Sequence, residues 1–366
     1  MTAVAYPSAE ISTSGRPWVR PVVQAWIVSR LAVGVGLVVG AAWRSGTLAN
    51  ANGFFAWDGQ WYLRTATVGY GAAPLPGQQS SWPFFPLLPG LLRATRAVGL
   101  PAGPALIVLN HLVLLVALIG LWQLAARQFG HEIANRSVWI LSVFPTSGVF
   151  SMLYPSAIFL AGSVWAFEYV ARRAWAMSGL AAAIATTIRP NGAATALIVA
   201  AIACRSCDRD RWRATALVGG PAAGALAGWI IVCTVATGNP LVFATAKAAW
   251  NEQTIVALAR QATRSTPLDS LTVHVVVGLL AVTLLRGVWN ELEPSWRVLV
   301  LVTLGVPMIT GLVGLGRYSN ECFPIAIAGG ATLARLPAPY RRVLLASSTV
   351  LSIVFAATMA GHGLVP

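Results

Sequence analysis

The sequence predicts an all-α polytopic membrane protein, a single bundle of about eleven transmembrane helices, because apolar runs of about 20 residues recur along it. Of the 366 residues, 57% are hydrophobic and only 10% are charged, whereas about a quarter of the residues in soluble domains are charged. The net charge of +14 comes mostly from arginines at the ends of the apolar runs. Such arginines hold loops in the cytoplasm, so the charge indicates membrane topology and no nucleic-acid partner.

Residues 1–21 are polar and are predicted to form a short cytoplasmic tail. They lack the apolar core and cleavage site of a signal peptide. The first apolar run begins near Val22 and predicts an uncleaved anchor. Residues 22–361 are predicted to form one transmembrane domain, and residues 362–366 a second tail. The predicted spans are 22–43, 103–125, 136–153, 155–171, 174–188, 190–204, 214–236, 271–289, 297–315, 319–335 and 343–361.

Residues 83–99 predict an interfacial or re-entrant helix that packs against protein, where broken backbone can find hydrogen-bond partners. Three prolines and two arginines interrupt this stretch: Pro83, Pro86, Pro89, Arg93 and Arg96. If it crossed the membrane, every later loop would invert. The arginine-rich residues 205–213 would then lie outside, against the positive-inside rule.

This arrangement brings five polar motifs to the external face, two of them in the external loops near residues 44–102 and 238–270 that are expected to carry the site. They are FFAWDGQWYLR, MLYPSAIF, TTIRPNG, GNPLVFATAKAAW and GRYSNECFP. The topology was set by the arginines of the loops and not by these motifs. Their location on one side of the membrane therefore indicates a single outward-facing site. The carboxylates that remain on this side are Asp58, Glu252, Asp269 and Glu321.

Asp58 is the main candidate for a catalytic group. A carboxylate at the membrane interface can take a proton from an acceptor hydroxyl within hydrogen-bond reach. The alternative is an N-cap for a short helix that begins near Gly59, since Asp is a preferred capping residue. Trp57, Trp61 and Tyr62 offer flat faces for a sugar ring or a lipid chain, or they anchor the chain at the membrane interface.

Three cations are candidates for binding the phosphate of a lipid donor. Arg189 precedes a predicted helix break at Pro190, and a guanidinium can make paired hydrogen bonds to phosphate. Arg317, beside Tyr318, and Lys247 in the second external loop are the others. The alternative for Arg189 and Arg317 is that each lies at a helix boundary and extends its charged group to the membrane interface. The alternative for Lys247 is a solvated surface lysine.

No metal or redox site is expected. Cys204 and Cys207 have CxxC spacing, but no second pair or histidine cluster accompanies them. No two of the four histidines have the spacing of metal ligands, so all four are expected in the core or at the membrane interface. They are His111, His131, His274 and His362.

The five motifs, in this order, resemble the family of GPI mannosyltransferase 2 (PIG-V) and its bacterial relatives, membrane glycosyltransferases of the GT-C class. The similarity runs from about residue 50 to 325. The matching positions are Trp57, Asp58, Trp61, Tyr62, Leu63, Gly69 and Tyr70; residues 84–89; Tyr154; Arg189 and Gly192; residues 238–241 and Phe243; and Arg317 and Tyr318. The chain departs from the family pattern at Ala56, Pro155, Ser156 and Lys247.

The resemblance implies a GT-C-type bundle that transfers mannose from polyprenyl-phosphate-mannose, with inversion, to an acceptor sugar on the outer face. Asp58 would accept the proton of the acceptor hydroxyl, and Arg317, Arg189 or Lys247 would stabilise the departing lipid phosphate. A lipid-linked donor needs no nucleotide loop and no cofactor. Substrate contacts are assigned to Trp57, Trp61, Tyr62, Tyr154, Asn239, Tyr318 and Glu321.

Two other functions stay open at this stage. A transporter or flippase of lipid-linked sugars would place charges at mid-membrane and show paired broken helices in two halves. A non-catalytic scaffold is favoured only if the departures at Ala56 and Ser156 have removed activity. An arginine-rich chain whose only lysine is Lys247 indicates a bacterial plasma membrane protein. The acceptor would then be an envelope glycolipid, such as a phosphatidylinositol mannoside or lipomannan, or another envelope glycan.

Overall fold

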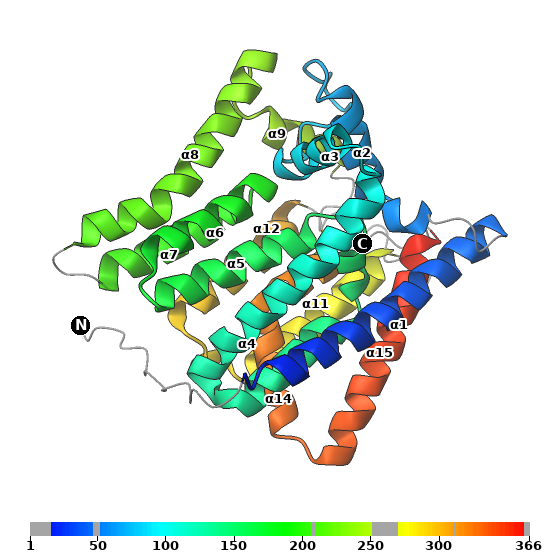
Figure 1. The fold of residues 1–366 in the computed structure, drawn as a ribbon, viewed down its shortest axis with the longest axis vertical. Coiled ribbons are helices and arrows are strands. Elements are labelled where there is room, and N and C mark those ends of the chain that lie inside the picture. The colour runs from blue at the N-terminus through cyan, green and yellow to red at the C-terminus, as the bar shows by residue number, and fades with distance from the viewer. Residues whose placement is uncertain are drawn as a thin grey trace.

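The apolar runs form helices, and no strand occurs in the part of the chain that the computed structural model describes (Figure 1). That part comprises residues 16–46, 52–206, 210–250, 270–310, 312 and 314–361. The predicted carboxylates Glu252 and Asp269, together with Cys207 and His362, lie outside it. Among the described residues, four helices are long and apolar enough to cross a membrane: α1 (Val19–Ser45), α4 (Ala102–Val143), α8 (Arg211–Thr237) and α15 (Ala338–Ala360).

Shorter elements complete the described bundle. The apolar ones are α5 (Ser156–Ala171), α6 (Trp175–Ile188), α7 (Gly192–Ser206), α11 (Ser270–Arg286), α12 (Pro294–Thr310) and α14 (Phe323–Ala334). The remaining ones are α2 (Asp58–Val68), α3 (Leu87–Ala97), α9 (Val242–Thr245), α13 (Leu315–Glu321), η1 (Asn52–Phe55), η2 (Ser147–Ser151), η3 (Ala246–Trp250) and η4 (Trp289–Glu291). The all-α composition of the predicted fold is confirmed.

Two predicted spans, 136–153 and 319–335, differ from the structure in their boundaries. The label α4 covers both runs 103–125 and 136–153, which are two helices that meet at Gly130, where the backbone is not helical (φ +82°, ψ 172°). The helix in the run 136–153 ends at Val143, because Pro145 follows and residues 147–151 form the short turn η2. The run 319–335 is divided at Cys322 into α13 and α14, and Pro324 occupies the first turn of α14.

The stretch that was predicted to be interfacial forms α3, an amphipathic helix of 11 residues. At 1.5 Å per residue it is about 16 Å long, too short to cross the hydrocarbon core. Its Leu88 and Leu92 are buried, while Arg93 donates hydrogen bonds to the carbonyl oxygens of Thr65 and Ala66 at the end of α2. The two helices therefore form one small unit, labelled α2 and α3 near the top of Figure 1.

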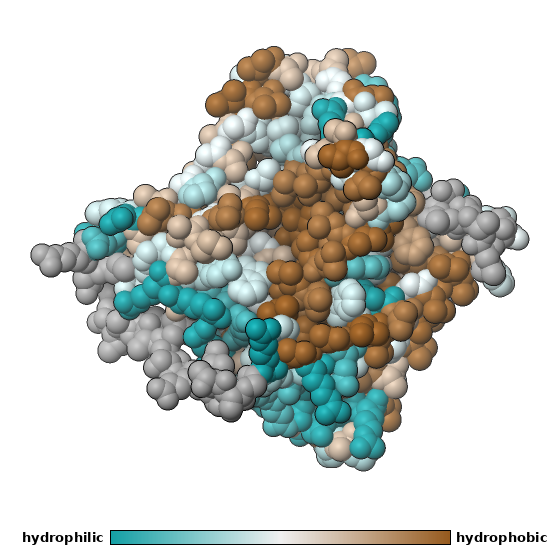
Figure 2. Space-filling view, in the orientation of Figure 1, coloured by the Kyte–Doolittle hydropathy of each residue, from teal (hydrophilic) through white to brown (hydrophobic). Residues whose placement is uncertain are grey.

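The polar contacts of the described bundle gather at two ends. The motif end carries Asp58, Tyr154, Arg189 and Arg317, whereas the charged end carries ion pairs between loop arginines and acids. At the charged end Glu168 pairs with Arg127 and Arg172, Glu291 with Arg335, and Glu132 with Arg136. Figure 2 shows hydrophilic residues gathered at the bottom of this face and a hydrophobic belt above them. This surface is that of a membrane protein.

A buried arginine fixes the turn between α4 and α5. Arg30, within α1, is only 7% exposed. It donates hydrogen bonds to the carbonyl oxygens of Ser142 and Ser147, at 3.0 Å each, and to the Ser151 hydroxyl at 2.8 Å. The last carbonyls of a helix have no partner within it, so this guanidinium satisfies groups that the end of α4 leaves open. Sequence analysis did not identify Arg30.

Small residues allow α1 and α15 to pack closely. Gly36 and Gly40, one turn apart on α1, face Ile353 and Ala357 of α15, and a Cβ atom at Gly40 would overlap the Ala357 carbonyl. Glycines at this spacing are typical of tightly packed membrane helices. The α1–α15 contact also positions the C-terminal end of α15, which holds Trp57 at the motif end.

We expect Gly40→Ala to lower the free energy of unfolding by about 1–3 kcal/mol, because the added methyl group must push α15 away. Thermal unfolding of the detergent-solubilised protein measures the effect. Gly34→Ala is the matched control on the same helix, since a Cβ atom there meets open space. Equal loss of stability in both variants would contradict the proposed packing.

Candidate functional site

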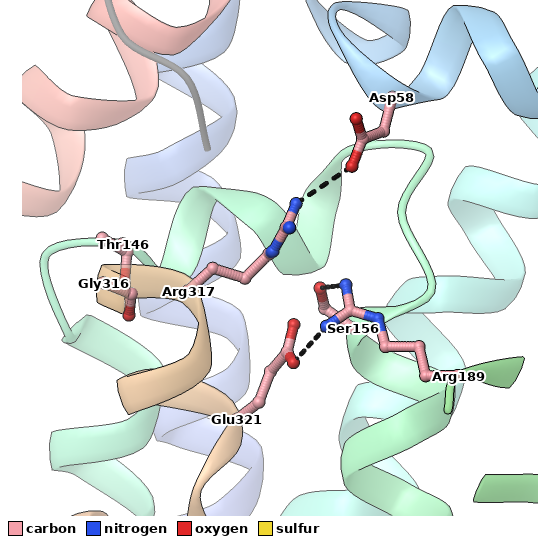
Figure 3. A network of polar contacts seen from close by, with 7 residues as sticks. All are labelled: Asp58, Thr146, Ser156, Arg189, Gly316, Arg317 and Glu321. Atoms are coloured by element: carbon pink, nitrogen blue, oxygen red, sulfur yellow. Dashed lines mark hydrogen bonds and ion pairs between the residues drawn. The ribbon is translucent and has the colours of Figure 1, made fainter. Parts of the chain in front are cut away.

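Four segments that are distant in the sequence meet at the motif end (Figure 3). They are the N-terminus of α2, the turn from η2 to α5, the break between α6 and α7, and the short helix α13. Each contributes a polar side chain because each is a place where a helix begins or ends. The site is therefore built from interruptions in otherwise apolar helices.

Asp58 is the first residue of α2, and its carboxylate reaches across to α13. Oδ2 accepts a hydrogen bond from Arg317 Nη1 at 3.1 Å, and the side chain keeps 29% of its surface exposed. The backbone N–H of Asp58 donates to the Tyr154 hydroxyl at 3.0 Å. The helix lacks a side-chain cap at its N-cap residue, Trp57. The alternative capping role for Asp58 is therefore not what the structure shows.

The residue before Asp58 has a strained backbone. Trp57 has φ +58° and ψ −124°, a region that L-residues rarely occupy. Such strain persists only where surrounding contacts impose it, and it is common at functional sites. Here the Trp57 indole N–H donates to the Met359 carbonyl at 3.2 Å. This contact with α15 helps to fix the direction of the Asp58 side chain.

Arg189 is engaged by protein groups. Pro190 follows it, so α6 ends and Arg189 takes an extended conformation. Its Nη1 forms an ion pair with Glu321 Oε2, and its Nη2 lies 3.3 Å from Ser156 Oγ. Arg189 is 8% exposed and Glu321 is 1% exposed. This buried pair connects α6 and α13, and leaves both residues less available to a substrate than the sequence suggested.

Arg317 has a different environment. Its guanidinium carbon lies 5.3 Å from the ring centroids of both Tyr154 and Tyr318, within the range of cation–π attraction. Among the described residues its buried Nε atom has no hydrogen-bond partner. Two further contacts hold the start of α13: Thr146 Oγ1 donates to the Gly316 carbonyl at 2.9 Å, and the Gly316 N–H donates to His274 Nδ1 at 3.1 Å.

Lys247, in η3, lies close enough to α13 to affect Tyr318. Burial tends to raise the pKa of the Tyr318 hydroxyl, but Lys247, Arg317 and Arg189 together bring the pKa below its ordinary value. The structure thus brings the three predicted cations to one region. Thr146 is a site residue that sequence analysis missed; it follows a helix-terminating proline in an otherwise apolar run, which was the available signal.

Trp61 and Tyr62 belong to an aromatic cluster beside Asp58. The Trp61 ring is parallel to that of Phe84, with centroids 5.9 Å apart, and Trp250 packs edge-on against both. Tyr62 also contacts Phe84, with ring centroids at 5.0 Å. Burial is the main reason that the pKa of the Tyr62 hydroxyl is raised. Trp250 was not anticipated, and it joins η3, and hence Lys247, to α2.

Asn239 and Tyr70 lie in other local structures. The Asn239 side-chain oxygen accepts from the Leu241 N–H at 2.9 Å, as in an Asx-turn that leads into α9. Tyr70 stacks on Trp82, and both contact Trp229 of α8. The contacts of Asn239 are those of a turn residue, so its predicted substrate role has no support from the geometry.

Comparison with solved structures identifies the fold. The crystal structure of the Archaeoglobus fulgidus oligosaccharyltransferase with zinc and sulfate superposes with a TM-score of 0.50 at 9% identity, over 94% of this chain and 53% of that one. The same protein, AglB, in complex with an inhibitory peptide and a dolichol-phosphate gives 0.47 at 9% identity, over 95% and 56%. This chain therefore spans about half the length of these neighbours. Comparison with protein-family models and with curated proteins gives no match.

The likeness confirms the GT-C-type helical bundle. One of the neighbouring structures contains zinc. Among the described residues, no three histidine, cysteine or acidic side chains lie together in a metal-binding group. The two carboxylates that the structure describes at the motif end, Asp58 and Glu321, each pair with an arginine instead. The described residues therefore do not fit a metal centre.

We expect Arg189→Gln to lower the free energy of unfolding by about 3–5 kcal/mol, because it leaves the Glu321 carboxylate buried without its partner. Thermal unfolding in detergent checks this loss. The double variant Arg189→Gln/Glu321→Gln should regain a large part of it, since neither charge is then buried alone. If the double variant is as unstable as the sum of the two single ones, the ion pair is not what stabilises this contact.

Proposed function

We propose that the protein is a membrane glycosyltransferase that uses a lipid-phosphate-linked sugar as donor. The observation that carries this proposal is the partly exposed Asp58 carboxylate, which pairs with Arg317 at the edge of a bundle of the GT-C type. Arg189 and Lys247, which act on the neighbouring Tyr318, and a group of aromatic rings lie in the same region. A base, an anion-stabilising group and flat apolar faces are what sugar transfer from a lipid phosphate requires.

The reaction is a single displacement. The acceptor hydroxyl gives its proton to the Asp58 carboxylate while its oxygen forms a bond to the anomeric carbon. The bond between that carbon and the phosphate oxygen breaks, and the electron pair leaves with the polyprenyl phosphate. Attack from the face opposite the phosphate inverts the anomeric centre. Arg317 and Lys247 stabilise the negative charge that develops on the phosphate.

The choice of mannose rests on the resemblance to the GPI mannosyltransferase 2 family. We propose polyprenyl-phosphate-mannose as the donor and an envelope glycolipid or glycan of a bacterium as the acceptor. The positive-inside rule supports an external location for the motif end, because the arginine-rich loops lie at the opposite end of the helices. Trp61 keeps part of its surface accessible, which supports a contact with a sugar ring near Asp58, whereas Tyr62 is buried.

The departure at Ser156 does not remove the local charge balance. The family pattern has an acidic residue at this position, next to Arg189. In this chain Ser156 accepts a hydrogen bond from Arg189, and Glu321 of α13 supplies the carboxylate. Transport of lipid-linked sugars is less well supported, because Arg30, a charge buried within a long helix, is satisfied by backbone carbonyls and a hydroxyl.

Asp58→Asn should reduce sugar transfer at least about 10²–10⁴-fold, because the amide cannot accept the proton of the acceptor. The assay follows labelled mannose from polyprenyl-phosphate-mannose into lipid or glycan in membranes that contain the protein. Glu132→Gln is the control, since it neutralises a carboxylate that is 72% exposed at the charged end. An Asp58→Asn protein with wild-type transfer would refute the mechanism.

The acceptor can be identified by comparing envelope glycolipids from a deletion strain and its parent by mass spectrometry. A mannosyltransferase of this kind should leave a glycolipid or glycan that lacks one or more hexoses and should restore it on complementation. Complementation with Asp58→Asn should fail. A loss of pentose instead of hexose would keep the enzyme class and revise the donor.

A further inference from the structure

We propose that Arg317 changes partner during the reaction: in the free protein it binds Asp58, and the phosphate of the lipid donor takes over this contact and releases the carboxylate. The inference rests on the proposed function and adds to it a means of regulation. The base would be available only after the donor has bound. The arrangement of the two arginines at the motif end carries the inference.

The two ion pairs are built differently. Arg189 uses Nη1 for Glu321 and Nη2 for Ser156, and both Arg189 and Glu321 are buried. Arg317 also meets its carboxylate through one pair of atoms, Nη1 and Oδ2, 3.1 Å apart, but it makes no second hydrogen bond among the described residues, and Asp58 is partly exposed. A guanidinium has five N–H donors, and paired bonds are its stronger mode of binding. The partly exposed Arg317–Asp58 contact is thus the one that another anion can replace.

Arg317 also has an unused donor in a buried position. Its Nε lacks a hydrogen-bond partner among the described residues, although its side chain is only 12% exposed. Buried donors in folded proteins are nearly always bonded, so an open one next to a proposed phosphate site indicates a missing acceptor. A phosphate oxygen would satisfy it, and a second oxygen could take the bond that Asp58 now accepts.

The rings around Arg317 keep the guanidinium in place during such an exchange. Tyr154 and Tyr318 both face it at 5.3 Å, so Arg317 has attractive contacts that do not depend on Asp58. Asp58 is the more exposed partner, with 29% of its side chain accessible against 12% for Arg317. The carboxylate can therefore turn away while the guanidinium stays.

The charges of the site favour an incoming anion. The described groups of the site are three cations, Arg189, Arg317 and Lys247, and two carboxylates, Asp58 and Glu321, so their net charge is +1. A donor phosphodiester brings one negative charge and neutralises the site. With the donor absent, Arg317 occupies Oδ2 of the carboxylate. Acceptor activation is thereby linked to the presence of donor.

Binding of polyprenyl phosphate, the product that retains the phosphate, tests the exchange in the purified full-length protein in nanodiscs. Asp58→Asn should bind polyprenyl phosphate about 3- to 10-fold more tightly than the wild type, because no carboxylate competes for Arg317. Arg317→Gln should bind it at least about 10-fold more weakly. Phosphate-free polyprenol is the comparison ligand, and Asp58→Asn should leave its binding unchanged.

The added positive charge of Asp58→Asn needs its own control. Glu132→Gln makes the same charge change at the charged end and should not alter the affinity for polyprenyl phosphate. Asp58→Asn should also have no effect in the Arg317→Gln background, which gives a double-mutant cycle for the pair. Arg317→Lys replaces Arg317→Gln in the cycle if the glutamine variant does not fold.

The inference is overturned if Asp58→Asn binds polyprenyl phosphate no more tightly than the wild type, or if it gains as much without Arg317 as with it. The transfer assay reports separately on the proposed function. Tighter binding that depends on Arg317, without any sugar transfer by the wild type, would support the exchange and refute the enzyme. Sugar transfer by the wild type, together with an unchanged affinity of Asp58→Asn for polyprenyl phosphate, would support the enzyme and refute the exchange.

Discussion

The mutual neutralisation of charge on α13 is the constraint on which the rest of the motif end depends. Arg317 and Glu321 lie one helical turn apart, so they project from the same side of this helix. Each needs an opposite charge from another element, since an unpaired buried charge is strongly unfavourable. Asp58 of α2 and Arg189 at the end of α6 provide them. These two contacts connect parts of the chain that are 132 and 259 residues apart.

This constraint explains why the helices are interrupted where they are. Inside a continuous helix the backbone groups bond to one another, whereas a break leaves backbone groups free beside a polar side chain. Pro145, Pro190 and Pro324 mark three such breaks, and the polar contacts of Thr146, Arg189 and α13 follow directly from them. Arg30 then stabilises the broken backbone between α4 and α5 from within α1.

Hydrophobic runs and arginine positions were sufficient to predict the all-α bundle, the short helix α3, and the assembly of Asp58, Tyr154, Arg189 and Arg317 at one end. These features depend on local composition and on the direction of each helix, both of which are present in the sequence. The partners of the charges were not predictable, because pairing depends on distances between segments far apart in the chain. Arg189 was assigned to a ligand for this reason, whereas it binds Glu321.

The same reasoning bears on the departures from the family pattern. A sequence motif records which residue carries a charge, but the chemistry depends on where the charge lies in space. Ser156 and Glu321 both contact the Arg189 guanidinium, so the carboxylate that pairs with Arg189 comes from α13 and not from the start of α5. Ala56 is buried, whereas Asp58 is partly exposed. The scaffold hypothesis requires a disabled site, but Arg189 has a carboxylate partner although residue 156 is a serine.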